Sequence, residues 1–229
     1  MKFKKPLIKL FFRLILVVVS LVLFSDCKSG NEKIVDEGVI EFDVTAVDPN
    51  HPWAGMIPTT ATLKFKDDKF VMEMSTMGMF TTTFICDQET KTLTQMVKFL
   101  DIKQACIESE KEIQKENLGY KIKFEESKET KMIAGYKCKK IKVTMVDKPE
   151  VNFEAFYTGE MGAENVNDLS PYNGVKGMLM QYRLKKMGLE LEFTAKKVKK
   201  EEITDNAFEL PAYFKVVSKP EIEKIFQQF

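Results

Sequence analysis

Runs in which apolar and polar residues alternate recur along most of the chain from residue 38 onward. Successive side chains of a strand point to opposite faces, so this alternation predicts β-strands with one buried and one solvated face. The alternating runs lie at residues 38–46, 60–66, 70–76, 79–86, 92–99, 120–125, 151–158, 178–185 and 189–198, and a further short strand is expected at 213–217. Short turns separate most of these runs, which favours a meander of antiparallel strands.

The most informative strand prediction falls on the segment Met132–Val146 (MIAGYKCKKIKVTMV). Tyr136 and Cys138 share one face, whereas Ile141 begins an apolar row of the opposite phase. A β-bulge at Lys139–Lys140 would bring both rows to the same side and would bend the strand. We therefore expect a curved sheet with a concave face that wraps around something.

Two segments have the character of helices. Residues Ile107–Asn117 (IESEKEIQKEN) are rich in glutamate and lysine and are followed by Leu118-Gly119, so they predict a short surface helix. In the C-terminal tail, apolar residues at helical spacing predict a helix that packs against the sheet, and they are Ile222, Ile225, Phe226 and Phe229.

Two long loops interrupt the strands. Residues 47–59 carry three prolines together with His51 and Trp53, the single histidine and tryptophan, and we expect this loop to form a rim or lid. Residues 159–176 contain three glycines and a proline without a period, and long ordered loops of this kind are often functional. The whole pattern predicts a mainly β (α+β) domain: a single curved antiparallel sheet or half-barrel of about ten strands, with a few helices packed on or plugging its concave face.

The N-terminus has the composition of a secretory signal. Basic residues precede the apolar run Leu14–Phe24, which is too short for a membrane span of ~20 residues. The run ends just before Cys27, and the pattern resembles a bacterial lipoprotein signal, in which the cysteine becomes the lipidated first residue. Phe24 and Asp26 depart from the leucine and the small residue usual in that pattern.

The chain therefore divides into a lipoprotein signal peptide (1–26), a lipidated tether (27–36) and one β-rich domain (37–229). An ordinary cleaved signal or an uncleaved anchor is the alternative. Removing residues 1–26 takes five of the 35 basic residues and one of the 34 acidic residues, which leaves 30 and 33. Both signs are interleaved without a basic block, so nucleic acid is not expected as a partner.

Three cysteines follow Cys27 in the sequence: Cys86, Cys106 and Cys138. An oxidising compartment allows one disulfide, for which Cys106 and Cys138 are the candidates. Three buried free thiols are the alternative, because free cysteine is among the most buried residue types.

No catalytic constellation can be assembled from the sequence. His51 lies in a loop between Asn50 and Pro52, and no cysteine stands in a nucleophile context that could use it. Acidic residues alternate with lysines on outward strand positions, and glycine-rich phosphate loops and zinc-ligand spacings are absent from the sequence. We therefore expect a protein that is not an enzyme and needs neither a cofactor nor a metal.

Methionines crowd one predicted hairpin, at Met72, Met74, Met77 and Met79. Thioether clusters suit Cu(I), which makes copper binding one hypothesis. The two pairs differ in strand phase, however, and no histidine or cysteine joins them. Methionine also serves as an adaptable apolar lining, and we prefer that interpretation.

Large apolar side chains gather on one face of the predicted sheet. The predicted helices are few, so part of the concave face is left to a loop or to a ligand; a fully packed core is the alternative. The candidate lining residues are Trp53, Phe70, Met72, Met74, Phe80, Phe84, Phe153, Tyr157, Met178, Met180 and Tyr182.

The segment Ile133–Lys140 (IAGYKCKK) is similar to the I-x-G-Y-x-C-x-K signature of a domain-of-unknown-function family of bacterial envelope lipoproteins and secreted proteins. The later AKKV strand and the closing residues Phe208–Pro211 and Tyr213 are also similar, so that the resemblance covers roughly residues 37–217. Such families resemble the lipoprotein-carrier (Lol-like) superfamily, in which an incomplete antiparallel barrel plugged by helices holds acyl chains. The resemblance implies a half-barrel with a hydrophobic pocket; it carries over only Tyr136 and Cys138, as family markers.

Lys28, directly after the lipidated cysteine, resembles a sorting signal that does not retain a lipoprotein at the inner membrane. The resemblance implies an outer-membrane lipoprotein that faces the periplasm, with surface exposure as an alternative. The leading hypothesis is a monomer, anchored to the membrane by its lipid, that binds a lipid or another hydrophobic ligand in the concave face. The alternatives are a structural or protein-interaction module of the cell envelope with partners at an edge strand, and methionine-based copper binding.

Overall fold

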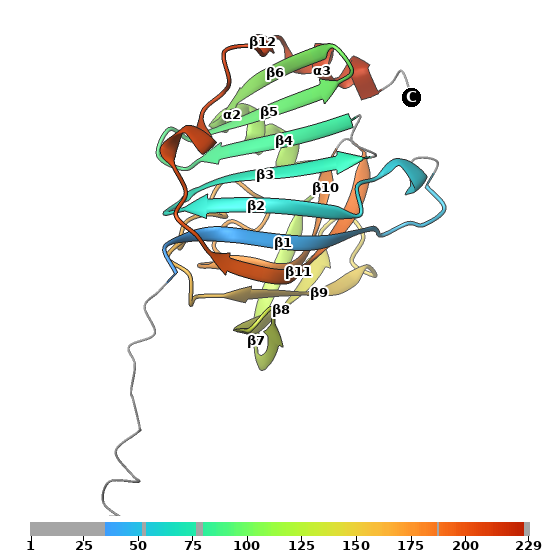
Figure 1. Cartoon of the computed structure of the whole chain (residues 1–229). Helices are drawn as coiled ribbons and strands as arrows, with labels where there is room; N and C mark the ends of the chain where they lie inside the picture. Colours follow the sequence, from blue (N-terminus) through green and yellow to red (C-terminus); the bar gives the residue numbers. More distant parts are fainter. Residues whose placement is uncertain (1–34, 52–53, 77–79, 187, 227–229) are drawn as a thin grey trace, which may run out of the picture. The chain divides into compact units, whose positions relative to one another are not determined.

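A computed structural model of the chain describes residues 35–51, 54–76, 80–186 and 188–226 (Figure 1). These residues belong to one unit, Ile34–Phe229, and their strands form a single open, curved sheet of 12 strands. The mainly β prediction is confirmed, and the strand number exceeds the expected one. In the part of the chain that is described, no helix is long and apolar enough to cross a membrane.

The strand β1 (Glu37–Ala46) lies inside the sheet and separates two antiparallel meanders. The first meander leads away from β1 through β2 (Thr60–Lys66), β3 (Lys69–Thr76), β4 (Phe80–Asp87), β5 (Thr92–Phe99) and β6 (Ile102–Ser109). The second starts at the far edge and returns to β1 through β7 (Ile122–Ile133), β8 (Tyr136–Met145), β9 (Asn152–Thr158), β10 (Met178–Lys186) and β11 (Leu189–Lys200). A short strand, β12 (Lys215–Val216), pairs in parallel with β6.

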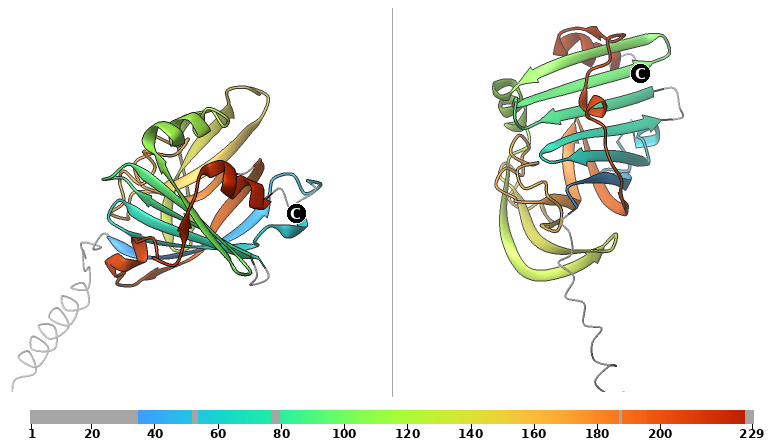
Figure 2. Two further views of the ribbon diagram at one scale, coloured as in Figure 1. Left: turned by 90° about the horizontal axis from the view of Figure 1, so that it is seen from above. Right: turned by 60° about the vertical axis from the view of Figure 1, so that its left-hand side comes forward.

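The connections between the meanders cover both faces of the sheet (Figure 2). Because β6 and β7 lie near opposite edges, the segment between them, with helix α2 (Glu110–Asn117), crosses the inner, concave face. The segment after β11, with the 3-10 helix η2 (Asp205–Phe208), returns along the outer face. There its apolar side chains pack on the outward residues of β3 to β6; the cluster consists of Val71, Ile85, Met96, Ala105, Phe208, Leu210 and Phe214.

Helix α3 (Lys219–Phe226) lies against the strands next to the β6 edge. Its Ile222 and Ile225 are buried against Val97 and Cys106, as the helical spacing in the tail predicts. Phe226 completes the contact, with its ring centroid 5.2 Å from that of Phe80. Phe229, the last residue of the predicted apolar row, lies outside the described residues.

The prediction of one long strand over Met132–Val146 is wrong. The segment is the end of β7, a turn at Ala134-Gly135, and β8. Both turn residues have positive φ, 49° for Ala134 and 89° for Gly135, as a two-residue hairpin turn requires. Glycine adopts this conformation without strain, so the Gly135-Tyr136 step in the family-like signature marks a hairpin.

The predicted bulge at Lys139–Lys140 is also wrong, because the extra residues lie in the neighbouring strand. β8 pairs with β9 without interruption from Lys139 to Thr144, whereas the register with β7 shifts between Glu126 and Thr130. β7 is the edge strand and has a partner on one side only, so it can accommodate the extra residues.

The irregular part of β7 also explains a buried lysine. The Lys140 side chain is 9% exposed, and its ammonium group lies 2.7 Å from Glu129 in the bulge and 2.8 Å from Glu154 on β9. Hydrogen bonds to these two carboxylates raise the pKa of Lys140 above its ordinary value. The irregular part of β7 thus places a carboxylate beside the Lys140 ammonium group, while Cys138 and Ile141 are fully buried in the main apolar cluster.

The predicted helix over Ile107–Asn117 begins three residues later, at Glu110. Residues Ile107–Ser109 are the end of β6, a strand that the sequence pattern did not predict as such. Ser109 is the N-cap, and its backbone N–H and hydroxyl donate to Glu112 at 2.8 and 2.6 Å in a capping box. This local cap ends the strand and starts the helix within one residue.

Candidate functional site

The inner face of the sheet contains a partly open cavity of about 120 Å³, lined by strands of both meanders, by α2 and by the loop of residues 159–177. The first meander contributes Leu63, Phe70, Met72, Phe84, Cys86 and Leu93. Strand β10 contributes Met178, Leu179, Tyr182, Leu184, Lys185 and Lys186. Helix α2 and the residues after it contribute Ile113, Glu116, Asn117 and Tyr120, and the loop contributes Val166, Asn167, Leu169, Ser170, Pro171 and Tyr172.

Register explains why the strand residues of the first meander share this wall. Phe70 on β3 pairs with Cys86 on β4, which in turn pairs with Leu93 on β5. Directly paired residues of antiparallel strands point to the same face, so one row of side chains runs across three strands. Met72 and Phe84 form the next row, and the wall is apolar throughout.

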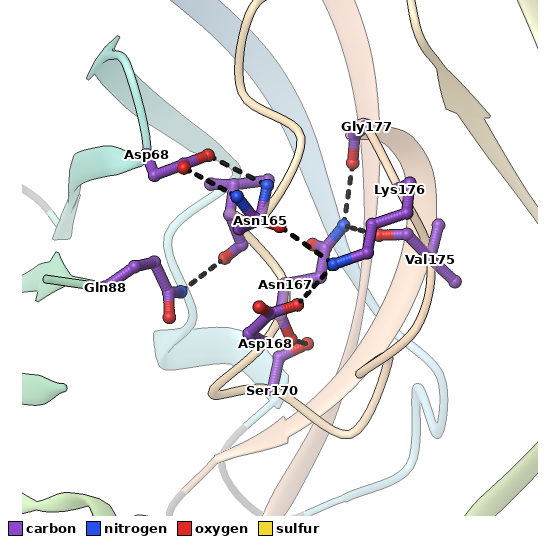
Figure 3. A network of polar contacts seen from close by, with 10 residues as sticks. Asp68, Gln88, Asn165, Asn167, Asp168, Ser170, Val175, Lys176 and Gly177 are labelled. Atoms are coloured by element: carbon purple, nitrogen blue, oxygen red, sulfur yellow. Dashed lines mark hydrogen bonds and ion pairs between the residues drawn. The ribbon is translucent and has the colours of Figure 1, made fainter.

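The loop wall is fastened to the first meander by amide hydrogen bonds (Figure 3). The backbone N–H and the side-chain amide of Asn165 donate to the Asp68 carboxylate at 2.8 and 2.9 Å. The Gln88 side chain donates to the Val166 carbonyl at 2.9 Å. These contacts hold the loop over the inner face of a sheet whose strands are far away in the sequence.

Within the loop, one buried side chain organises the backbone. The amide of Asn167 donates to the carbonyls of Val175 at 2.9 Å and Gly177 at 2.7 Å, and Asn167 is 5% exposed (Figure 3). Tyr172 is fully buried, and its hydroxyl donates to the Arg183 carbonyl at 2.7 Å. Buried polar groups that are paired in this way stabilise a single conformation of the loop.

The α2 wall is held in a different way. Ile113 is the buried residue of the helix. Glu116 instead forms ion pairs, with Lys186 of β10 at 3.1 Å and with Lys219 of α3 at 2.6 Å. Lys219 also pairs with the buried Glu108 of β6.

The ion pairs set the charge state of this wall. Burial raises the pKa of the Glu116 carboxyl, but the nearby ammonium groups of Lys186 and Lys219 outweigh it, so that the pKa lies below its ordinary value. Burial lowers the pKa of Lys219, and its hydrogen bonds to the carboxylates of Glu108 and Glu116 outweigh this effect and raise it. Both groups are therefore charged at neutral pH, and their ion pairs hold α2 against the sheet and α3.

Most polar groups that line the cavity already have protein partners. The Asn117 amide donates to the Leu169 carbonyl at 3.0 Å, and the Tyr120 hydroxyl donates to Glu190 at 2.8 Å. Burial raises the pKa of the Tyr182 hydroxyl, so this group is neutral at ordinary pH. The cavity therefore offers a mainly apolar surface whose wall also contains hydroxyl, amide and charged groups.

The candidate lining residues divide into two groups. Phe70, Met72, Phe84, Met178 and Tyr182 line the cavity. The others that are described pack in the core elsewhere and do not line it; they are Met74, Phe80, Phe153, Tyr157 and Met180. Tyr157 donates to Glu126 at 2.6 Å, and burial, with this bond, raises its pKa to about 12. Trp53 lies outside the described residues, and none of the described residues of loop 47–59 lines the cavity.

The predicted Cys106–Cys138 disulfide is not formed. Cys86, Cys106 and Cys138 are buried free thiols, and Cys106 and Cys138 belong to different apolar clusters. Burial raises the pKa of Cys86 to about 12, so the thiol in the cavity wall is neutral at ordinary pH and unsuited to nucleophilic attack.

A metal site is not found in the part of the chain that the structure describes. Within it, His, Cys, Asp and Glu side chains form no cluster of three or more that could hold a metal ion. The thioether hypothesis rests on four methionines, of which Met72 and Met74 are buried in the main apolar cluster. Met77 and Met79 lie outside the described residues.

The walls made by α2 and the loop are not among the predicted lining residues. One signal was available, because Val166, Leu169 and Tyr172 are apolar residues three apart within a loop rich in asparagine and glycine. Apolar side chains at this spacing in such a loop indicate a buried face, and all three side chains are buried in the structure. Ile113 was equally visible, because it is the single apolar residue among the polar and charged residues 110–117.

Comparison with known proteins gives a likeness of fold only. No family model matches the chain, and no curated protein matches it. A solved structure of PNGF-II in space group C2 is similar, with a TM-score of 0.50 and 12% sequence identity. The match covers 84% of this chain and 33% of the PNGF-II chain, so this chain spans about a third of the length of that neighbour.

Proposed function

We propose that the chain is a non-enzymatic envelope lipoprotein, lipidated at Cys27, that binds an apolar ligand in the cavity of its curved sheet. The observation that carries this proposal is the cavity of about 120 Å³ between the inner face, α2 and the loop 159–177. Apolar side chains surround it, and most of the polar groups in its wall are already hydrogen-bonded within the protein. Such a site gains affinity from the removal of apolar surface from water.

The size of the cavity limits the ligand. An apolar cavity of ~150 Å³ is known to hold a benzene molecule, and the cavity of this protein is about 120 Å³. The site therefore suits a ring or one segment of an acyl chain, and a second acyl chain would need the walls to move. Each methylene group transferred from water into such a site contributes ~0.8 kcal/mol.

Native mass spectrometry of residues 28–229, purified without detergent, tests the proposal. The described members of all three apolar clusters lie between Val35 and Phe226, so this segment contains the described core. We expect an excess mass that is released as a small apolar molecule on denaturation, and displacement of a fluorescent fatty acid by added ligand. A bare polypeptide mass together with no uptake of the fluorescent fatty acid would contradict the proposal.

A matched pair of substitutions places the binding in the cavity. Leu93 lines the cavity, whereas its neighbour Thr94 points to the opposite face of β5. Leu93→Phe should reduce binding of the fluorescent fatty acid because the larger ring fills the cavity, and Thr94→Phe should leave binding unchanged. Equal binding by both variants would place the ligand elsewhere.

The second candidate is a protein-interaction module of the cell envelope. The observation that favours it is the edge strand β7, whose outer side has no neighbouring strand in the described sheet. Met132 near its end is 63% exposed. Exposed edges can accept a strand of a partner, although the charged residues of β7 reduce this tendency. Failure of both ligand tests above would put this candidate first.

A further inference from the structure

The charged groups beside the cavity balance one another. Four of them form the ion-paired group that holds α2, and they are Glu108, Glu116, Lys186 and Lys219. Lys185 lies directly opposite Glu190 in the β10–β11 register, and Glu190 also accepts the hydrogen bond of the lining residue Tyr120. The charges of these described residues cancel, so the wall has no spare counter-charge for an ionic ligand.

This balance disfavours a small ion inside the cavity. Such a ligand would give up its hydration and would have to break one of the existing pairs to find a counter-charge. A long-chain amphiphile avoids this cost, because the cavity is partly open and the head group can stay in water. A ligand that fits wholly inside the cavity should therefore be neutral.

Aromatic side chains reach the cavity from all of its walls. They are Phe70 of β3, Phe84 of β4, Tyr120 after α2, Tyr172 of the loop and Tyr182 of β10. They make up five of the 22 lining residues, about twice the 11% share of aromatic residues in the whole chain. Tyr172 and Tyr182 already form an edge-to-face pair, with ring centroids 6.1 Å apart and planes at 83°. A ring in the cavity can make further contacts of this kind.

Sulfur atoms in the wall strengthen the preference for a ring. Met72 on β3, Cys86 on β4 and Met178 on β10 line the cavity. Sulfur makes favourable contacts with the edges of aromatic rings, and the unbranched methionine side chain adapts to the shape of its neighbour. A saturated ring of the same size would gain the burial of its surface without these contacts.

We propose, building on the function proposed above, that the ligand is a small neutral molecule with one aromatic ring. The ring lies among the aromatic and sulfur-containing side chains of the wall, and any polar substituent is uncharged. The cavity of about 120 Å³ is close in size to the cavity of ~150 Å³ that holds benzene, so it admits one ring and excludes a second.

Phenol and cyclohexanol isolate the aromatic character, because each has a six-carbon ring and one hydroxyl group. Residues 28–229 with isotope-labelled methionine methyl groups would be titrated with each probe and followed by NMR. The signals of Met72 and Met178 should shift, while Met74, which is buried outside the cavity, serves as an internal control. We expect phenol to bind about fivefold tighter than cyclohexanol. Equal affinities would overturn the aromatic inference and leave the apolar-ligand function standing.

Two phenylalanines provide matched variants for the same comparison. Phe84 lines the cavity and Phe153 does not, yet they are 6% and 7% exposed and each has a cation over its ring. Phe84→Leu should lower the preference for phenol to about twofold, because one ring of the wall is lost, and Phe153→Leu should keep it at about fivefold. A preference that is unchanged in Phe84→Leu would contradict the inference. The comparison in the unchanged protein does not depend on either variant.

Benzyl alcohol, benzoate and benzylammonium test the requirement for a neutral ligand, since they share a ring with a one-carbon substituent and differ in charge. At neutral pH both ions should bind about tenfold more weakly than benzyl alcohol. An ion that binds as tightly as the alcohol would overturn the inference of a neutral ligand. Failure of every probe to shift the signals of Met72 and Met178 would overturn the apolar-ligand function itself, and this inference with it.

Discussion

Two adjoining segments line the cavity, the loop 159–177 and helix α2, and they are held mainly by different forces. The loop 159–177 is buried over much of its length and is held by amide hydrogen bonds, above all those of Asn167. Helix α2 has one buried side chain, Ile113, and is held at its C-terminal end by the ion pairs of Glu116. The loop behaves as part of the core, whereas α2 is attached to the surface of that core.

The difference indicates which wall can yield to a ligand. Buried hydrogen bonds and apolar contacts open only with a large part of the domain, whereas a short helix with few buried contacts can open locally. Ion pairs with partly exposed members also weaken with salt and with pH, which buried amide pairs do not. We therefore expect ligands to enter past α2, with the loop as the fixed wall.

The largest effect is expected from Asn167→Ala. The change removes two buried hydrogen bonds and leaves the carbonyls of Val175 and Gly177 without partners. It should lower the free energy of unfolding by about 3 kcal/mol, because unsatisfied buried acceptors add to the lost bonds. Urea denaturation measures this, and Asn173→Ala, at an exposed position of the same loop, should have almost no effect. Equal effects of the two changes would show that the loop is not held by Asn167.

An intermediate effect is expected from Ile113→Ala. Ile113 is 2% exposed and is the buried anchor of α2, so its truncation should destabilise the helix by about 2 kcal/mol. The loss should be local: amide hydrogen exchange should accelerate across residues 110–121, while the loop 159–177 keeps its protection. Leu118→Ala, at a position that is 59% exposed, serves as the control. Acceleration in both walls together would mean that they open as one unit.

The smallest effect is expected from Glu116→Gln, and it should depend on pH. The pKa of Glu116 in the folded protein lies below its ordinary value of 4.5, so its ion pairs stabilise the fold above that value. This stabilisation is lost as the pH falls below 4.5 and the carboxylate is protonated. Glu116→Gln should therefore cost about 1 kcal/mol at neutral pH, and the difference should vanish in acid. Glu164→Gln, at an exposed site without a described partner, should show no such pH dependence.

The sequence predicted which face of a strand is buried, but it did not predict which buried residues of the curved sheet line the cavity. Alternation assigned Met72 and Met74 to one buried face, and both are buried, but only Met72 lines the cavity. The same is true of Met178 and Met180 on β10, where the register with β9 shifts between Leu179 and Gln181 and brings Leu179 into the wall. A period of two reports which side of a sheet a residue is on, and it contains no information on what covers that side.

The irregular elements were the least predictable. Residues 107–109 read as helix because glutamate and serine dominate them, yet pairing with β5 extends β6 to Ser109. The shift in β7 depends on the fact that β7 is an edge strand, which only the full strand order reveals. Long-range pairing of this kind overrides local propensity.

The place of β1 in the sheet has a consequence for how the chain folds. β1 is the first strand to be synthesised and pairs at once with β2, but its other neighbour, β11, is the last long strand. Until β11 arrives, β1 keeps an open hydrogen-bonding edge, and its Phe42 lacks the aromatic contact with Phe193 that it has in the native seam. Contacts so distant in sequence form late and slowly, and open strand edges invite aggregation. The β1–β11 pair in the middle of the sheet is thus the last pair of long strands to form. Until it forms, the incomplete chain is most prone to aggregate at the open edge of β1.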